Sequence, residues 1–139
     1  MLIFENLLVY KNAFAVNQSV YRFLKQNISI ARYVRDQLGR ASLSVQLNIA
    51  EGSGRFANKD RRNFFIMARS SALECASIIQ FLAAEEELSK EFENELLTQY
   101  EAISKMLYAM IRNLEKKMGI RFQELSNFLS FYCPFCFFF

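Results

Sequence analysis

The sequence lacks several residue types on which common protein functions depend. Its 139 residues include no histidine and no tryptophan, a single proline and four glycines. Without histidine the chain lacks the commonest general base and the commonest metal ligand, and none of its serines stands in a recognisable nucleophile motif. We therefore expect a protein that is not an enzyme and that uses no metal and no cofactor.

The shortage of helix-breaking residues also indicates the fold class. Pro134 is the only proline, so residues 1–133 contain almost nothing that forbids helix. Apolar residues recur at helical spacing in four long segments with short polar links, and no strand pattern competes. The sequence predicts an all-α protein, an antiparallel up-down four-helix bundle over residues 1–120, followed by an apolar C-terminal extension over residues 121–139.

The predicted helices begin near Phe4, Ser29, Asn58 and Glu91. Gly52 is expected to end the second helix in a left-handed conformation, and Gly119 the fourth. The expected core positions are Leu7, Tyr10, Phe14, Tyr21 and Leu24 in the first helix, Val34, Leu38, Ala41 and Val45 in the second, Phe64, Met67, Ala68, Ser71, Cys75, Ile78 and Leu82 in the third, and Phe92, Leu96, Ile103, Leu107, Met110 and Leu114 in the fourth.

Surplus apolar residues suggest contacts between subunits. The hydrophobic fraction is 53%, whereas about 45–50% is usual for a globular domain. Leu43, Leu47, Phe65 and Ile79 fall outside the predicted core stripes, and exposed apolar patches usually mark interfaces. No apolar run reaches the ~20 residues of a membrane span, and the N-terminus lacks a basic signal-peptide start. We expect a cytoplasmic protein that does not bind membrane.

One segment, Asn48-Ile-Ala-Glu51-Gly52-Ser-Gly54-Arg55, interrupts the apolar pattern of the second helix. Two interpretations compete for it and for Arg69 and Glu74 in the third helix. In the structural interpretation, Glu51 and Arg69 form a largely buried ion pair with Asn48 hydrogen-bonded alongside. In the functional interpretation, the Gly-Ser-Gly corner and the start of the third helix form a pocket for a phosphate or nucleotide.

The same segment carries a resemblance to a known family. Together with Ile66-Met-Ala-Arg69-Ser-Ser-Ala-Leu-Glu74 and the segment from Glu101 to Arg112, it resembles bacterial four-helix-bundle proteins encoded in intervening sequences of 23S ribosomal RNA genes. That family is distantly similar to the accessory variability determinants of diversity-generating retroelements. The resemblance implies a ring-shaped homo-oligomer, typically a pentamer, and a system that involves RNA or a reverse transcriptase.

The charges are unevenly distributed although the net charge is only +3. Residues 32–69 contain eight basic and three acidic residues, whereas residues 74–101 contain one basic and eight acidic residues. Basic surfaces bind phosphate backbones mainly by releasing counterions, so we expect nucleic-acid binding, with RNA as the preferred candidate and weak sequence specificity. The candidate residues are Arg32, Arg35, Arg40, Arg55, Lys59, Arg61, Arg62, Lys105 and Arg112.

Two alternatives to nucleic-acid binding remain open at the level of sequence. The basic residues are also compatible with ordinary solvated helix faces. The apolar surplus and the acidic segment 74–101 are compatible with a scaffold that docks a partner polypeptide. In the C-terminal extension, Cys133 and Cys136 form a C-x-x-C motif, which without a second pair or a histidine is weak support for a redox or zinc site.

Overall fold

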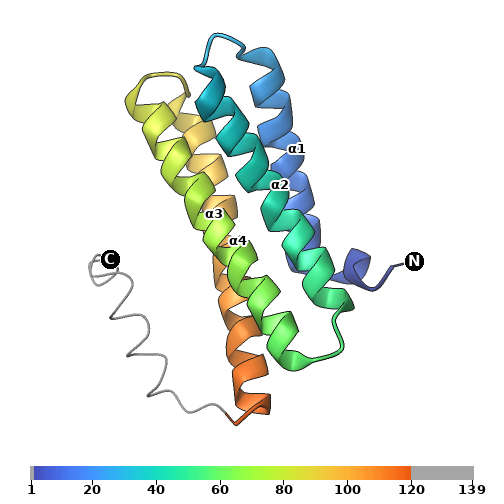
Figure 1. The fold of residues 1–139 in the computed structure, drawn as a ribbon. Helices are drawn as coiled ribbons and strands as arrows, with labels where there is room; N and C mark the ends of the chain where they lie inside the picture. Colours follow the sequence, from blue (N-terminus) through green and yellow to red (C-terminus); the bar gives the residue numbers. More distant parts are fainter. Residues whose placement is uncertain (1, 120–139) are drawn as a thin grey trace.

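The computed structural model, which describes residues 2–119, is an up-down four-helix bundle (Figure 1). A short 3-10 helix η1 precedes four long helices, and the elements are η1 (Ile3–Asn6), α1 (Leu8–Gln26), α2 (Arg32–Gly54), α3 (Asn58–Ala84) and α4 (Lys90–Lys117). Each long helix packs against two others, with α1 diagonally opposite α3. The predicted all-α bundle is confirmed, while the predicted extension 121–139 and its C-x-x-C motif lie outside the described residues.

Local signals account for where α4 begins and ends. The Ser89 hydroxyl accepts a hydrogen bond from the Phe92 backbone N–H at 3.2 Å, which caps the helix and satisfies one of its free donors. Glu91 and Glu93 lie in the first turn, where the helix dipole favours negative charge. Gly119, with a φ of 69°, follows the last turn in the left-handed conformation predicted for it.

The core stripes of α2 and α4 are largely those expected from the sequence. On α2, Val34, Leu38, Ala41 and Val45 are all buried, but the stripe continues to Ile49 rather than to Asn48. On α4 the buried apolar residues are Leu96, Tyr100, Ile103, Leu107, Ile111 and Leu114, while Phe92 and Met110 lie at the edge of the core. The stripe steps by three and four residues, as one face of a helix requires.

The predicted face of α1 is wrong. Its buried residues are Val9, Ala13, Val16 and Val20, whereas Phe14 and Tyr21 are exposed. Tyr10 and Leu24 pack at the edge of the core. The aromatic residues made the neighbouring stripe look more hydrophobic, but α1 approaches α2 and α4 through small and β-branched side chains, and the larger rings lie outside.

The predicted face of α3 is also partly wrong. Ala68, Cys75 and Leu82 are buried as expected, but so are Phe65 and Ile79, which were expected to be available for an interface. Met67, expected in the core, is exposed. Because α3 contacts both α2 and α4, its buried stripe combines residues of the predicted core face with the neighbouring Phe65 and Ile79. The prediction that Leu43 and Leu47 are exposed is confirmed.

Gly52 has a different role from the one predicted. It lies inside α2, which continues to Gly54, and a Cβ atom at this position would lie 2.8 Å from Phe65 Cε1. Real Cβ atoms do not approach a ring carbon so closely. Glycine is needed here because the Phe65 ring packs directly against the backbone of α2, and not because the helix ends.

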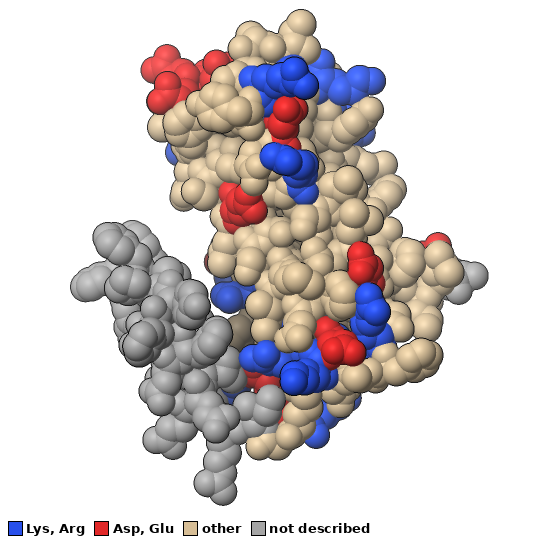
Figure 2. Space-filling view, in the orientation of Figure 1, with Lys and Arg blue, Asp and Glu red and all other residues tan. Residues whose placement is uncertain are grey.

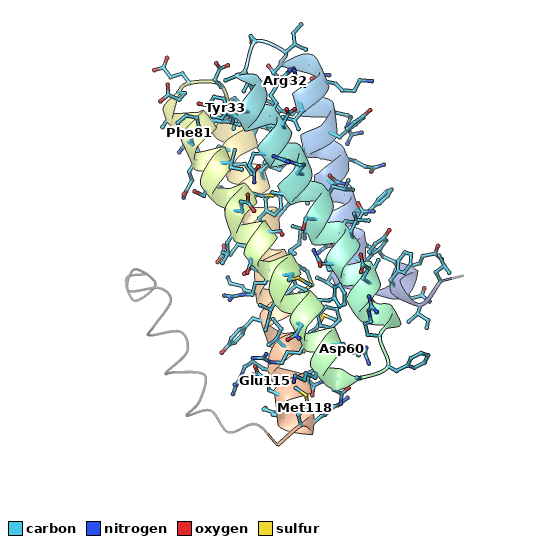
Figure 3. All side chains as sticks on the ribbon, in the orientation of Figure 1. Arg32, Tyr33, Asp60, Phe81, Glu115 and Met118 are labelled. Carbon is cyan, nitrogen blue, oxygen red and sulfur yellow. The ribbon has the colours of Figure 1, made fainter. Side chains whose placement is uncertain are left out.

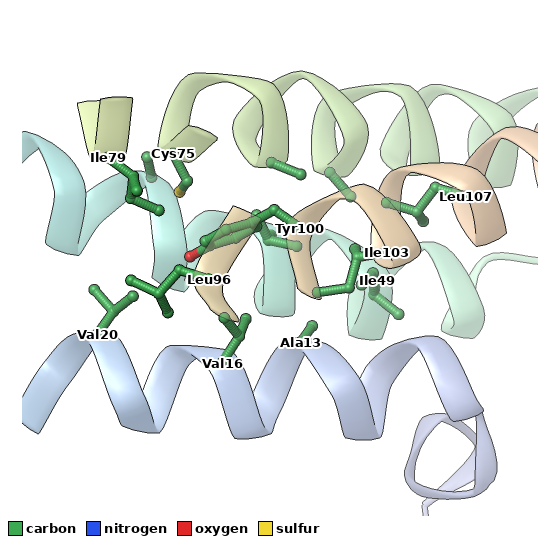
Figure 4. Packing of buried hydrophobic residues seen from close by; sticks show 14 of the residues in the cluster. Ala13, Val16, Val20, Ile49, Cys75, Ile79, Leu96, Tyr100, Ile103 and Leu107 are labelled. Atoms are coloured by element: carbon green, nitrogen blue, oxygen red, sulfur yellow. The ribbon is translucent and has the colours of Figure 1, made fainter. Parts of the chain in front are cut away.

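A chain of hydrogen bonds crosses the apolar core around Tyr100, which Figure 4 shows among the buried side chains. The Tyr100 hydroxyl donates to Ser42 Oγ at 3.0 Å, and Ser42 Oγ donates to Asn17 Oδ1 at 3.0 Å. Asn17 Nδ2 then donates to Gln46 Oε1 at 2.9 Å, and Gln46 Nε2 donates to Tyr10 Oη at 3.1 Å. The chain joins α1, α2 and α4: the Tyr100–Ser42 bond is buried, where a satisfied polar group matters most, and the other three links are partly buried.

By length and composition, α3 is the one helix among residues 2–119 that is apolar enough to cross a membrane. It packs between α2 and α4 and contributes six buried residues to the bundle. Its apolar character is accounted for by this packing, so α3 is a core helix.

Candidate functional site

Three parts of the chain that are distant in sequence meet at one end of the bundle. The end of α2, the start of α3 and the end of α4 lie together there, at the lower end of Figure 1, and Figure 2 shows Lys and Arg gathered at the same end. We call this region the basic end. It contains seven basic residues and three acidic ones: Arg55, Lys59, Arg61, Arg62, Arg112, Lys116 and Lys117, with Glu51, Asp60 and Glu115.

Glu115 is the central residue of the basic end, and it is almost completely buried. Its side chain is 1% exposed, with Arg62 Nε 2.7 Å from Oε1 and Arg112 Nη1 3.0 Å from Oε2. The Arg62 and Arg112 side chains are 21% and 20% exposed, so both keep some contact with water. One carboxylate therefore holds two guanidinium groups and ties the start of α3 to the end of α4.

The sequence analysis did not identify Glu115. Its only sequence signal is that it is the single acidic residue between Lys105 and Arg121, among five basic ones. The structure places two of the predicted phosphate-binding residues, Arg62 and Arg112, on this carboxylate. We therefore assign these two arginines to the internal structure of the basic end.

The other cations of the basic end are more accessible. Lys59, Lys116 and Lys117 are exposed, and among the described residues none of them forms an ion pair. Arg55 lies with its guanidinium carbon 4.6 Å from the centre of the Phe64 ring and its Nη2 3.5 Å from Glu51 Oε2. Arg61 is half-buried, and its Nε has no hydrogen-bond partner in the described part of the chain.

The remaining predicted cations do not join this surface. Arg32 and Arg35 lie near the start of α2, at the opposite end from the start of α3, and Arg32 Nε is 3.4 Å from Asp36 Oδ2. Arg40 donates to Gln37 Oε1 at 3.0 Å. On α4, Lys105 Nζ lies 2.6 Å from Glu101 Oε1. Five of the nine candidates therefore meet at the basic end, and four are distributed along α2 and α4.

The predicted ion pair between Glu51 and Arg69 is wrong. The Glu51 side chain is 55% exposed and pairs with Arg55 one turn further along α2. Arg69 faces α4 instead, where its Nε donates to Ser104 Oγ at 3.2 Å and its guanidinium lies 5.5 Å from the centre of the Tyr108 ring. The short corner brings α2 and α3 together but does not determine which face each helix turns toward the other.

Asn48 and Glu74 form hydrogen bonds of a different kind from those expected. Asn48 Nδ2 donates to the Ser44 backbone oxygen at 2.8 Å and to Ser44 Oγ at 3.0 Å, both within α2. The Ser44 and Ser71 hydroxyls are 3.0 Å apart and join α2 to α3. Glu74 accepts a hydrogen bond from Gln37 on α2. The motif thus links α2 and α3 through one hydroxyl–hydroxyl hydrogen bond and one bond from an amide to an exposed carboxylate, without a buried charge.

The Gly-Ser-Gly corner is helical and does not form a phosphate-binding loop. Gly52, Ser53 and Gly54 all belong to α2, and Ser53 Oγ donates to the Ile49 backbone oxygen at 2.6 Å. Gly52 and Ser53 are buried. Because these groups are directed into the helix and its packing, the corner does not present a ring of free N–H groups to an anion.

These features define a small helical-bundle protein with one basic end and, over residues 2–119, no cluster of three side chains suited to a metal ion. The chain belongs to the 23S rRNA-intervening sequence protein family, whose model matches residues 5–109. A crystal structure of a protein of unknown function from the S23 ribosomal protein family of Bacteroides thetaiotaomicron has a TM-score of 0.73 to it. The two are 19% identical, and the match covers 76% of this chain and 96% of that one, which establishes the shared fold. No curated protein has a significantly similar sequence.

Proposed function

We propose that this protein is a non-catalytic, cytoplasmic nucleic-acid-binding protein whose basic end contacts the phosphate backbone. One observation carries the proposal: seven cations from three segments of the chain meet at one end of the bundle with only three acids among them, one of which is buried. A dense cationic surface attracts phosphates and releases their counterions. The contacts are to charge and not to base edges, so we expect weak sequence specificity.

Within this surface, we assign direct phosphate contact to Lys59, Lys116 and Lys117, with Arg55 and Arg61 beside them. Arg62 and Arg112 act indirectly, because they hold Glu115 and thereby position the end of α4 against the start of α3. The family takes its name from 23S rRNA, which makes RNA the first nucleic acid to test. A homo-oligomer, such as the pentamer implied by the resemblance, would repeat the basic end and increase the number of phosphate contacts.

The salt dependence of binding tests this mechanism. Anisotropy of a labelled RNA should give a log Kd that rises linearly with log salt, with a slope of roughly 0.7 per phosphate contact on a single strand. Lys59→Glu with Lys117→Glu should weaken binding to all sequences alike and lower the slope by about 1.4. The matched control, Arg22→Glu with Lys25→Glu, makes the same change in net charge on α1, toward the opposite end of the bundle.

Equal losses in the two double variants would show that only the net charge of the protein matters. An affinity that does not change with ionic strength would exclude the mechanism. The Arg61→Glu, Arg62→Glu pair is unsuitable for this test, because Arg62 is bound to the buried Glu115 and its reversal would disturb the fold.

A protein-interaction scaffold is the second candidate, and a specific observation favours it. Leu43 and Leu47 on α2 and Met67 and Leu73 on α3 are exposed on adjacent helices. Exposed apolar side chains on neighbouring elements suit a partner polypeptide, for which the resemblance suggests a reverse transcriptase. Absence of RNA binding, together with stable co-purification of one defined protein that Leu43→Ser with Leu47→Ser abolishes, would favour the scaffold.

A further inference from the structure

The corner between α2 and α3 presents a phenyl ring to solvent at the basic end. Phe56 is 102% exposed, whereas the other exposed large apolar side chains of the described chain reach at most 75%. It lies in the link between Gly54, where α2 ends, and Asn58, where α3 begins. No part of the bundle covers the ring, so packing does not account for an aromatic residue at this position.

The backbone around Phe56 is held on both sides. The Arg55 N–H donates to the Gly52 backbone oxygen at 3.3 Å, and the Arg61 N–H donates to the Ala57 backbone oxygen at 3.0 Å. The link between the two helices is only three residues long. A short, anchored link limits how far the ring can retract toward the core, so the backbone at Phe56 has little conformational freedom to lose on binding.

Two cationic side chains lie close to Phe56 in the chain, with one acidic residue, Asp60, directly after them. Arg55 precedes it and stacks on the Phe64 ring at 4.6 Å, and the exposed Lys59 is the second residue of α3. Proteins that bind single strands combine a cationic track for the backbone with exposed aromatic rings on which bases stack. An unpaired base offers its flat face to such a ring, whereas the bases of a duplex are already stacked and paired.

We propose that Phe56 is a stacking platform for an unpaired base, and that the ligand of the basic end is single-stranded nucleic acid. This inference rests on the proposed function and adds the class of ligand to it. Every base has a flat face, so stacking on Phe56 tolerates any sequence, in keeping with weak specificity. The cations beside the ring hold the phosphates that flank the stacked base.

Phe81 on α3 provides a control for Phe56. It is also an exposed phenylalanine, but it lies at the opposite end from Asp60, Glu115 and Met118, as Figure 3 shows. About one helical turn further along the chain lie three acidic residues, Glu85, Glu86 and Glu87. Carboxylates and phosphates are both negatively charged and repel each other, so a base should not stack on Phe81.

Tryptophan substitution reports stacking directly. The chain contains no tryptophan, so Phe56→Trp introduces a single indole that keeps a stacking surface. Addition of an oligouridylate should quench its emission, and an RNA hairpin with a fully paired stem and a minimal loop should quench it far less at equal saturation. The emission of Phe81→Trp should not change with either RNA. Equal quenching of both variants, or of Phe56→Trp by both RNAs, would overturn the proposal.

Affinity measurements complete the test. Phe56→Ala should weaken binding of the oligouridylate at least about fivefold, the lower end of the effect of removing one stacking ring. Its salt slope and its thermal midpoint should stay at the wild-type values, because no phosphate contact and no buried contact is lost. Phe56→Tyr should bind as the wild type does, and hairpin binding should be unaffected by either change.

The outcomes separate this inference from the proposed function. Wild-type protein that binds neither RNA overturns both proposals. Salt-dependent binding that survives Phe56→Ala without loss supports the basic end as a backbone site but overturns the stacking platform. An equal loss of oligouridylate and hairpin binding would also overturn it, since stacking requires an unpaired base.

Discussion

The two ends of the bundle carry similar numbers of charged residues but organise them differently. At the basic end the central carboxylate, Glu115, is buried between two arginines and the lysines face water. At the opposite end, Glu85, Glu86 and Glu87 are exposed in the turn before α4, while Arg32 is paired with Asp36. Figure 2 shows both signs of charge at each end of the visible face. The sign of each surface therefore depends on which charges are buried, and the net charge of +3 does not reveal it.

A second contrast concerns how a buried acid is compensated. At the opposite end, Glu93 Oε2 lies 2.7 Å from Lys90 Nζ, but the Lys90 side chain is 74% exposed. Glu115 is bound to two arginines that are each only about one-fifth exposed. If Glu93 is neutralised, water can easily hydrate the exposed Lys90 ammonium group. If Glu115 is neutralised, water reaches the two guanidinium groups poorly. The basic end should therefore be the more sensitive of the two to loss of its acid.

The largest effect should come from Glu115→Gln. It removes the carboxylate that binds both Arg62 and Arg112, and we expect a loss of about 3 kcal/mol in unfolding free energy, toward the lower end for broken buried pairs because both arginines keep some water contact. Urea unfolding measures it. Glu93→Gln, the matched change at the opposite end, should lose about 1 kcal/mol or less, and equal losses would contradict the comparison.

The next largest effect should come from Gly52→Ala. The added Cβ would lie 2.8 Å from Phe65 Cε1, so the ring or the backbone of α2 must shift, at about 1–3 kcal/mol. Gly39→Ala, nearer the opposite end, meets Leu24 Cδ1 at 3.4 Å and gains helix propensity, so it should be neutral or stabilising by up to about 1 kcal/mol. Thermal unfolding of the two variants distinguishes them, and a loss in both would show that α2 is tightly packed along its whole length.

Alkaline pH should weaken the core between the two ends. Burial raises the pKa of the Cys75 thiol from 9.0 to about 12, and burial likewise raises the pKa of the Tyr100 phenol. Both groups are neutral in the folded state. Their contribution to the unfolding free energy is therefore complete below the pKa that each group has in the unfolded chain, and it is lost as the pH rises toward the pKa in the folded protein. For Cys75, about 1 kcal/mol should be lost by about pH 10.

Urea unfolding of the wild type and of Cys75→Ala across this pH range checks the linkage. The stability of the variant should depend less steeply on pH above 9, the unfolded pKa of the missing thiol. A pH dependence as steep as that of the wild type would show that other groups account for the alkaline loss.

The smallest effect should come from Glu51→Gln. The Glu51 and Arg55 side chains are about half exposed and solvent screens their interaction, so the loss should be below about 1 kcal/mol and should shrink further at high salt. If Glu51 formed a buried ion pair with Arg69, the same substitution would lower the unfolding free energy several times more. Denaturant midpoints at low and high salt measure the difference, and a large, salt-independent loss would restore the buried-pair interpretation.

Much of the architecture was predictable from the sequence because helical periodicity is local. The steps of three and four residues on α2 and α4 identified most of their buried residues, and Gly119 marked the end of α4. On α1 and α3, two adjacent stripes were both apolar, and the pattern did not show which one faces the core. The choice depends on the rotation of each helix about its own axis against two neighbours, and on which side chains fit the space between them.

The candidate site divides in the same way. The sequence by itself determined a helical chain without histidine, and a cluster of cations where α2 meets α3, because composition and short spacing do not depend on packing. Only the tertiary structure decided that Arg69 turns to Ser104, that α4 brings Lys116 and Lys117 to the same end, and that Glu115 is buried there. These facts depend on contacts between residues dozens of positions apart, whose geometry is set only when all four helices pack together.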